Sequence, residues 1–463
     1  MHEEAQAKNT SADNISKARA EAVQLIYDVT EQGAYANLAL MKTLRHSKLS
    51  PIDRNLLTQL VNGTIRMLKH LDWVLNLFLK QDISKQNPWL RNILRVSAYQ
   101  IMFMERIPDF ACVNDAVELT RKRCNANLAR VTNGVLRNLV RNKDNIKYPP
   151  QGSKEYLAVY YSHPQELVDK LLTLFGAEQS KNILVYNNQP ARVDFRFNTL
   201  KTTRDDLIQE LHQNGVKCCA SPFVPCSIRI EDMKGPLEEL PPYKEGRFYV
   251  QNEASMLATL ILDPLPGEKV LDLCCGVGGK TTHIAEKMQN QGLIKAYDSY
   301  SRKIDILKTN CTRLGIKIVN AIAQDIMLLE ENQEAERVML DAPCSGSGVL
   351  NRRSDARWNK DIQAINQLTD LQLQFLEKAG SLVGDGGYLL YSTCSVLPAE
   401  NEEIVQAFIA NNPFELEGFD QKLDFFPLDS RDKENAGQGM LTLIPGKYDT
   451  DGMFFALMRK NEA

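Results

Sequence analysis

The sequence predicts an α/β fold in its C-terminal half, preceded by a small α+β module and by an all-helical N-terminal domain. Strand-like and helix-like segments alternate from about residue 246 onward, whereas apolar residues recur at every third or fourth position through residues 15–145. A chain of 463 residues is long enough for about three domains. We therefore expect an all-α domain over residues 1–147, a helical connector with the α+β module over 148–245, and the α/β domain over 246–463.

The composition is that of an ordinary globular protein. Apolar residues make up 43% and charged residues 24% of the chain, which argues against disorder, collagen or coiled coil as a description of the whole. No apolar run approaches the roughly 18 residues of a membrane helix, and the polar N-terminus MHEEAQAKNTSADN lacks the apolar core of a signal peptide. We therefore expect a monomeric, cytoplasmic protein with no membrane partner.

The cysteines indicate reduced thiols. The chain contains ten cysteines and no C-x-x-C pair, which is too sparse for a disulfide scaffold. Cys218, Cys219 and Cys226 lie close together in the sequence but lack a nearby fourth ligand, so we predict no metal site.

Charge is unevenly distributed along the chain. Residues 1–150 contain 22 Lys and Arg against 14 Asp and Glu, a balance of +8, while the remaining residues carry −11. Such a basic surplus favours a polyanionic partner. Arg130, Arg137 and Arg141 are spaced seven and four residues apart, so they share one helix face. That face is either an ordinary solvated surface or a stripe that contacts RNA.

The predicted module follows a Pro-, Gly- and Ser-rich boundary at residues 147–153. After a short helical stretch, residues 192–198 (RVDFRFN) alternate like a strand. Residues 204–215 are typical of a helix that ends on a glycine, and residues 227–232 (SIRIED) of a further strand. Together these segments predict a small α+β unit.

Five strand candidates alternate with helices in the C-terminal part. Strands are predicted at residues 269–275, 293–298, 318–324, 337–343 and 387–395, with helices at 281–288 and 301–315 among the segments between them. This alternation predicts a parallel, doubly wound sheet. In such a sheet the ligand lies beyond the C-terminal ends of the strands.

The first of these strands runs into a glycine-rich turn that precedes a helix. The turn consists of Cys274, Cys275, Gly276, Val277, Gly278, Gly279 and Lys280. Such a turn lets a ligand approach the backbone, and the helix N-terminus favours an anion, although glycine turns also arise from packing alone. Asp298 closes the second strand, where an acid can accept ribose hydroxyls, and Asp325 closes the third, in position to meet a base edge. A nucleoside that carries a carboxylate fits these features, which predicts S-adenosylmethionine as the cofactor.

Two cysteines follow the fourth and fifth strand candidates. If these strands are neighbours, about 4.8 Å apart, Cys344 and Cys394 face one crevice beside Asp341. A thiolate that adds to carbon 6 of a pyrimidine makes carbon 5 nucleophilic, and this chemistry needs an activated cysteine, an acid and a base. The alternative is that both thiols are buried small apolar residues, a common position for free cysteine.

The motifs resemble a known family. DAPCSGSG (341–348) and YSTCS (391–395), downstream of LDLCCGVGGKTTHIAE, resemble the RNA 5-methylcytosine methyltransferases of the Nop2/Sun family. Residues 53–66, 107–122 and 130–142 resemble a NusB-like RNA-binding domain. The resemblance spans nearly the whole chain after its first ~15 residues. It implies a Rossmann-like, S-adenosylmethionine-dependent methyltransferase domain that acts on a cytosine of 16S ribosomal RNA.

The resemblance also implies roles for individual residues. It makes Cys394 the nucleophile, gives Cys344 a part in product release, and places Asp341 against the target base and Lys280 toward the active site. The cofactor is expected to be held by Cys274–Lys280, Asp298, Asp325 and Asp341. The family usually has C-A-A-P-G-G-K where this chain has CCGVGGK, so we expect a looser turn.

Three other functions remain open at this stage. In a DNA cytosine-5 methyltransferase the cysteine after proline attacks, which would make Cys344 the nucleophile and leave Cys394 unexplained. The same chemistry could act on transfer RNA. The third alternative is a non-catalytic RNA-binding assembly factor that keeps a cofactor-binding fold without its activity.

Overall fold

The computed structural model describes residues 15–330, 334–358 and 362–462. The chain forms two compact units. The first takes in the described residues of Met1–Gln189 and Leu350–Asn359, and the second those of Pro190–Val349 and Lys360–Ala463. The three-part division at residues 147 and 245 stays a prediction.

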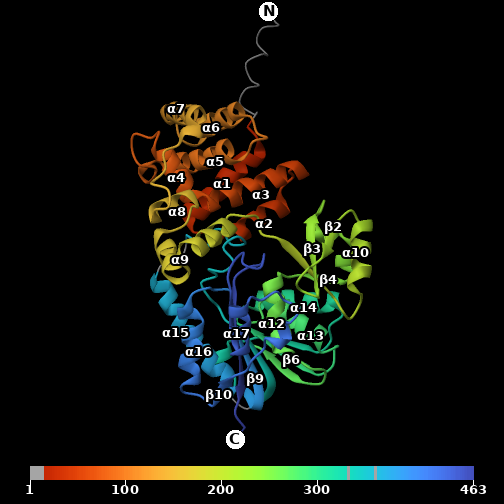
Figure 1. Ribbon diagram of the computed structural model, residues 1–463. Coiled ribbons are helices and arrows are strands. Elements are labelled where there is room, and N and C mark those ends of the chain that lie inside the picture. The colour runs from red at the N-terminus through yellow and green to blue at the C-terminus, as the bar shows by residue number, and fades with distance from the viewer. Residues whose placement is uncertain (1–14, 331–333, 359–361, 463) are drawn as a thin grey trace, which may run out of the picture. The chain divides into compact units, whose positions relative to one another are not determined.

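The described part of the first unit is helical, as the apolar periodicity predicts (Figure 1). The apolar residues of its first seven helices form one buried core, in which Ile26, Leu60 and Ile93 are fully enclosed. None of the helices in the described ranges has both the length and the apolarity of a membrane span. The helices are α1 (Lys17–Gln32), α2 (Ala36–His46), α3 (Pro51–Arg66), α4 (Leu68–Asn76), α5 (Pro88–Phe103), α6 (Asp109–Arg123), α7 (Ala126–Asn142), α8 (Lys154–Tyr160) and α9 (Gln165–Asn187), with short 3-10 turns η1 (Ile83–Lys85) and η2 (Lys143–Asn145).

A segment from far along the chain completes this unit. Residues 350–358 follow the loop that carries Cys344, yet they pack with the N-terminal helices. Arg357 is buried there and donates hydrogen bonds to the carbonyl oxygens of Ser162 (3.1 Å) and Asn187 (2.9 Å). The Trp358 indole donates to the carbonyl of Ile65 (2.8 Å). These bonds make residues 350–358 part of the helical unit.

The second unit contains a four-stranded antiparallel sheet with the strand order β2-β3-β1-β4. Its elements are β1 (Val193–Phe197), α10 (Arg204–Gln213), β2 (Lys217–Ala220), β3 (Ser227–Asp232), η3 (Leu237–Glu239), α11 (Pro241–Lys244) and β4 (Phe248–Val250). The predicted strands β1 and β3 and the helix between them are confirmed. Strands β2 and β4 were not predicted, because three or four residues are too few to show a clear alternation. Phe195 and Phe248 stack across β1 and β4 with ring centroids 4.1 Å apart.

The larger sheet of this unit has the order β10-β12-β9-β8-β5-β6-β7, with β11 paired to β12. Its strands are β5 (Lys269–Asp272), β6 (Leu293–Asp298), β7 (Val319–Ala323), β8 (Ala335–Asp341), β9 (Val383–Thr393), β10 (Phe414–Leu416), β11 (Met440–Leu443) and β12 (Met453–Lys460). Strands β5 to β9 are parallel, which confirms the predicted parallel arrangement for those five. The last three strands pair antiparallel, so the sheet as a whole is mixed.

Helices cover both faces of the larger sheet (Figure 1). Leu390 and Phe455 belong to the core with α12, α13 and α14, whereas Tyr391 and Phe454 belong to the core with α15 and α16. This alternation is the period of a strand with both faces buried. The covering elements are α12 (Glu253–Leu262), α13 (Gly279–Lys287), α14 (Ser301–Leu314), η4 (Ile326–Leu328), α15 (Ile362–Ser381), η5 (Pro398–Glu400), α16 (Glu402–Ile409), η6 (Gln421–Leu423) and α17 (Ser430–Gly437).

Candidate active site

The two predicted cysteines meet at the C-terminal ends of β8 and β9. These strands are parallel neighbours, and their register pairs Asp341 with Ser392. Cys344 and Cys394 follow within three residues, and their sulfur atoms lie 3.2 Å apart. Neither cysteine is in a disulfide. The structure therefore brings both thiols to one point, as the sequence predicts.

The contact between the thiols makes them chemically different. The hydrogen bond to Cys394, together with burial, raises the pKa of the Cys344 thiol well above its ordinary value. Cys344 therefore keeps its proton at neutral pH and can donate it in a hydrogen bond to the sulfur of Cys394. A thiol that donates to a neighbouring sulfur stabilises negative charge on that sulfur.

Asp341 and Lys280 also meet at this edge of the sheet. The ammonium of Lys280, on α13, lies 2.6 Å from one carboxylate oxygen of Asp341. The hydroxyl of Ser392 donates to the other oxygen at 3.0 Å. Both predicted residues are thus placed together, and Ser392, which the sequence analysis did not single out, helps to orient the carboxylate.

Asp272, which the sequence analysis also missed, is the last residue of β5. Its carboxyl group is fully enclosed, and this burial raises its pKa to about 6. The hydroxyl of Thr281 donates to it at 2.6 Å. The charge of Asp341 raises the Asp272 pKa further, whereas Lys280 lowers it. An aspartate between the apolar residues of the predicted strand, residues 269–275, was the available signal for this residue.

A single buried carboxylate holds both cysteine loops. Glu400, at the end of η5, is completely enclosed. It accepts hydrogen bonds from the backbone N–H of Ser345 (2.7 Å), from the Ser345 hydroxyl and from the Ser395 hydroxyl. Ser345 follows Cys344 directly and Ser395 follows Cys394 directly. Glu400 therefore fixes the residue next to each thiol.

Other side chains hold Glu400 in turn. The Tyr391 hydroxyl donates to its carbonyl oxygen at 2.8 Å, and the Gln372 amide donates to its carboxylate at 3.3 Å. The neighbouring Asn401 accepts from the Thr393 hydroxyl at 2.6 Å and donates to the Ser395 carbonyl at 3.0 Å. This network makes the ends of β8 and β9 a preorganised site.

Two glycines of the glycine-rich turn adopt a left-handed backbone conformation. Gly276 and Gly278 have φ values of +56° and +95°, in the left-handed region that favours glycine. A Cβ on Gly278 would lie 2.2 Å from Leu307, whereas nothing lies within 4 Å of the corresponding position on Gly276. The turn is thus open to a ligand at Gly276. The Val277 carbonyl accepts from the Asn310 amide at 3.0 Å, so side chains hold the turn in place without a proline.

Asp298 is the last residue of β6, as predicted, and it lies beside the turn. Its buried carboxylate accepts from the backbone N–H groups of Gly276 (3.2 Å) and Tyr300 (2.9 Å) and pairs with the ammonium of Lys303 (3.0 Å). Asp325, at the end of β7, is exposed and accepts from the N–H of Met327 as the cap of η4.

In the turn, Cys275 is buried and Cys274 is partly buried. Burial raises the pKa of both thiols well above the ordinary range, so both stay protonated. In the described ranges, no group of three or more His, Cys, Asp or Glu side chains is arranged to hold a metal ion.

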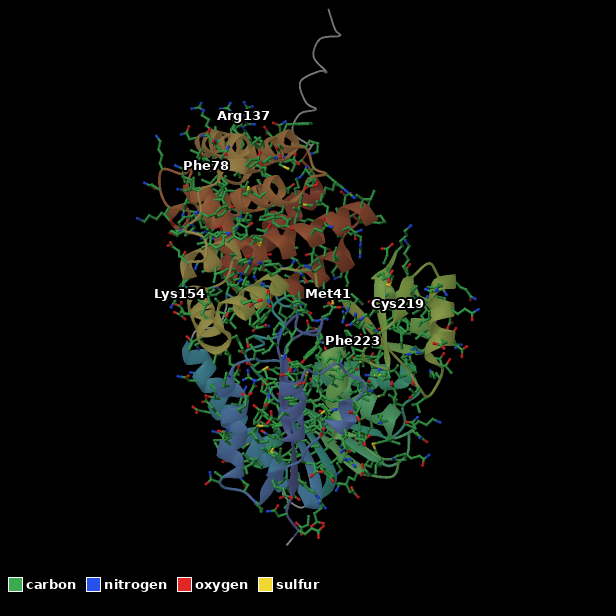
Figure 2. The ribbon with its side chains drawn as sticks, in the orientation of Figure 1. Met41, Phe78, Arg137, Lys154, Cys219 and Phe223 are labelled. Carbon is green, nitrogen blue, oxygen red and sulfur yellow. The ribbon has the colours of Figure 1, made fainter. Side chains whose placement is uncertain are left out.

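The predicted arginine stripe lies on α7. Arg130, Arg137 and Arg141 are all exposed, and Figure 2 labels the middle one. A contact between this stripe and RNA stays a prediction.

Three family models match successive parts of the chain. Residues 16–141 match the NusB family, residues 163–235 the ferredoxin-like domain of RsmF/B-like methyltransferases, and residues 259–459 the model described as 16S rRNA methyltransferase RsmB/F. The matches follow the order of the helical, α+β and α/β parts.

Full-length relatives show the same similarity. The chain is 33% identical over 453 residues to the probable ribosomal RNA small subunit methyltransferase B of Bacillus subtilis (strain 168), which covers 95% of this chain and 98% of that protein. It is 31% identical to the ribosomal RNA small subunit methyltransferase B of Escherichia coli O6:K15:H31, with 96% and 98% covered. The crystal structure of PH0851 superposes with a TM-score of 0.79 at 28% identity, over 95% of this chain and 98% of that one.

Proposed function

Because the chain belongs to the 16S rRNA methyltransferase RsmB/F family, we propose that it transfers a methyl group from S-adenosylmethionine to carbon 5 of a cytosine in 16S rRNA through a covalent cysteine adduct. The observation that carries this proposal is the pair of thiols whose sulfur atoms lie 3.2 Å apart. The raised pKa of Cys344 supports it, because it gives the two thiols different roles. Glu400 is a buried carboxylate shared between the two cysteine loops. Two thiols with only a structural role would not need such a residue.

The glycine turn fits S-adenosylmethionine. The open backbone at Gly276 leaves room for a ligand, and the N-terminus of α13 favours its carboxylate. Asp298 would accept hydrogen bonds from the ribose hydroxyls. The ammonium of Lys303, which pairs with Asp298 and is half-exposed, can move aside to admit them. When bound, S-adenosylmethionine supplies an electrophilic methyl group.

Cys394 begins the reaction on the cytosine. Its thiolate donates an electron pair to carbon 6, a carbon–sulfur bond forms, and the ring electrons shift so that carbon 5 becomes nucleophilic. Asp341 contacts the target base, and Lys280, 2.6 Å from it, offsets its charge. This pair positions the ring while carbon 5 gains the methyl group, and the electron pair of the broken methyl–sulfur bond stays on the sulfur.

Cys344 completes the cycle. While Cys394 is a free thiolate, the hydrogen bond between the two sulfurs keeps the proton on Cys344. Once Cys394 is bonded to carbon 6 it no longer carries that charge, so the pKa of Cys344 falls and its proton passes to solvent. The Cys344 thiolate then removes the proton from carbon 5. The carbon 6–sulfur bond then breaks, and its electron pair returns to Cys394.

Incubation with labelled S-adenosylmethionine tests the proposal. We expect label in 5-methylcytosine of 16S rRNA and none in duplex DNA. If label enters tRNA alone, tRNA and not 16S rRNA is the substrate. If label enters no nucleic acid, the result favours the non-catalytic assembly factor. Mapping of methylated cytosines after deletion of the gene then identifies the target nucleotide.

Asp298→Ala is expected to weaken S-adenosylmethionine binding at least tenfold. A carboxylate that accepts two ribose hydroxyls contributes about 1.5–3 kcal/mol for each charge-assisted bond. Calorimetric titration of the full-length protein measures the change, and Asp305→Ala, an exposed carboxylate on α14, serves as the control. Equal affinity in both variants would mean that the cofactor binds elsewhere.

A further inference from the structure

The helical unit contains a pocket lined by aromatic rings. The pocket has a volume of about 430 Å³, within the range of roughly 300–1,000 Å³ that ligand sites show. It lies among α3, α4, α5 and α8 and the turn that follows α8. We call it the aromatic pocket, and its rings are those of His70, Tyr99, Phe103, Tyr148, Tyr160 and Tyr161.

The rings form one connected cluster. The ring centroids of Tyr148 and Tyr160 are 5.2 Å apart, those of His70 and Tyr148 5.4 Å, and those of His70 and Phe103 5.3 Å. Two of the rings are also open to solvent: Tyr160 is 38% and Phe103 41% exposed. A grouped, exposed set of large apolar rings marks a binding surface more often than scattered single residues do.

His70 fixes the pocket in one shape. Burial lowers the pKa of His70 to about 4, so its ring is neutral and has a single N–H. Nδ1 lies 3.1 Å from the Tyr160 carbonyl, which can only accept, so Nδ1 carries the proton. Nε2 therefore accepts from the Tyr148 hydroxyl at 3.2 Å. A pocket with its rings already fixed loses little entropy when a ligand binds.

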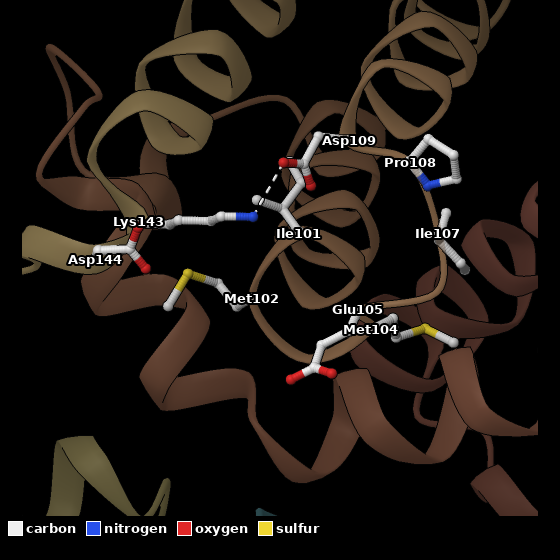
Figure 3. Close-up of a pocket in the computed structure, with 9 residues that line it drawn as sticks. All are labelled: Ile101, Met102, Met104, Glu105, Ile107, Pro108, Asp109, Lys143 and Asp144. Carbon is white, nitrogen blue, oxygen red and sulfur yellow. Dashed lines mark hydrogen bonds and ion pairs between the residues drawn. The ribbon is translucent and has the colours of Figure 1, made fainter.

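The charge of the pocket favours an anionic ligand. Arg66 lines it. One terminal nitrogen of its guanidinium donates to the Asn351 carbonyl at 3.2 Å, while its Nε is buried without a hydrogen-bond partner in the described part of the chain. None of the described residues that line the pocket is an acid. A second pocket of the same unit, in Figure 3, contrasts with it. That pocket is lined by Glu105, Asp109 and Asp144, and its lysine is paired to Asp109 at 3.0 Å.

We propose that the aromatic pocket binds one unpaired, unstacked base of the substrate RNA, which stacks on Tyr160 and Phe103 while Arg66 favours the adjoining phosphate. The proposal rests on the proposed function, which makes RNA the substrate. Stacking of a base on an aromatic ring tolerates any sequence, because every base has a π face. The pocket would thus hold RNA through single-stranded nucleotides, in addition to contacts with the phosphate backbone.

Binding of RNA by full-length variants tests this inference. The probes are a fluorescein-labelled single-stranded RNA of mixed sequence and a fully paired RNA duplex of the same length, followed by anisotropy. Tyr160→Leu with Phe103→Leu removes the rings but keeps apolar volume. We expect this double variant to bind the single strand at least tenfold more weakly, with duplex affinity changed less than twofold.

Two control variants keep the test specific. Tyr160→Phe keeps the ring, and Phe110→Leu removes an aromatic side chain that is 70% exposed and lies outside the pocket; both should bind RNA like the parent protein. Removal of Arg130, Arg137 and Arg141 should instead weaken binding to both probes and reduce its salt dependence. Circular dichroism shows whether each variant is folded.

The outcomes separate this inference from the proposed function. Affinity for S-adenosylmethionine should be unchanged in the double variant, because both rings lie in the helical unit and outside the glycine turn. Unchanged single-strand affinity would overturn the inference and leave the pocket to a protein partner or to packing, even if rRNA methylation is intact. An equal loss for single strand and duplex would also overturn it. If the parent protein methylates no RNA, the proposed function is contradicted instead. The binding assay does not depend on methylation, so it still tests the pocket.

Discussion

Cys394→Ala is expected to form no covalent complex with RNA and to methylate none, whereas Cys344→Ala is expected to accumulate such a complex. The nucleophile is needed to make the carbon–sulfur bond, so its loss stops the reaction before the adduct. Cys344 is needed later, when the proton leaves carbon 5 and the bond to Cys394 breaks. Without it, an enzyme molecule methylates once and stays attached to its product. Labelled RNA on a denaturing gel reports both results.

Three alternatives give different patterns on the same gel. A mechanism of the DNA type predicts the reverse assignment, with the adduct in Cys394→Ala and none in Cys344→Ala. Structural thiols predict that both variants turn over without an adduct, apart from a small loss of stability from the cavity. Cys219→Ala, which removes an exposed thiol of β2, is the control and should behave like the parent protein. An adduct that persists in the double Cys344 and Cys394 variant would contradict both assignments.

The cysteine pair could be predicted because its geometry follows from local patterns. Each cysteine comes just after a strand that has the apolar run of a buried parallel strand, and neighbouring parallel strands end at the same edge of a sheet. The same reasoning placed Asp298 beside the glycine turn, where the structure has it within 3.2 Å of the Gly276 nitrogen. Prediction succeeded where a residue's position depends on its own strand.

Prediction from the sequence failed where a residue's role depends on partners that are distant in the sequence. Glu400 lies 55 residues after Ser345, and no local pattern distinguishes it from the exposed Glu403. The partners of Arg357 lie 170 and 195 residues earlier, so the sequence gives no reason to join residues 350–358 to the N-terminal helices. Such contacts depend on the tertiary fold, which periodicity does not describe.

The antiparallel strands were missed for another reason. β10 has only three residues, and β12 is apolar at almost every position because both of its faces are buried. A continuous apolar run does not distinguish a strand from a buried helix. The alternation of helices and strands also ends at β11, which β12 follows without a helix between them. The pattern that predicted the parallel strands therefore gives no information about this last pair.

Glu400→Ala is expected to lower the methylation rate about 100-fold, because small displacements at a reacting centre cost factors of this size. The substitution leaves the Ser345 N–H and the hydroxyls of Ser345 and Ser395 without their common acceptor, in a place that water does not reach. Each unsatisfied buried group costs about 1–3 kcal/mol, so the free energy of unfolding should fall by roughly 3 kcal/mol or more. Thermal unfolding and labelled methyl transfer measure the two effects.

A loss of stability alone would not show that Glu400 positions the thiols. The distinguishing measurement is the pH dependence of alkylation of Cys394 by iodoacetamide, well below the unfolding temperature. If Glu400 holds the two loops so that Cys344 donates to Cys394, its removal separates the sulfurs, the thiolate loses its donor, and the alkylation profile shifts to higher pH. Glu400→Gln keeps one acceptor for the Ser345 N–H and should give an intermediate shift, and the exposed control Glu403→Ala none. An unshifted profile in Glu400→Ala, with near-normal methyl transfer, would reduce Glu400 to a stabilising contact.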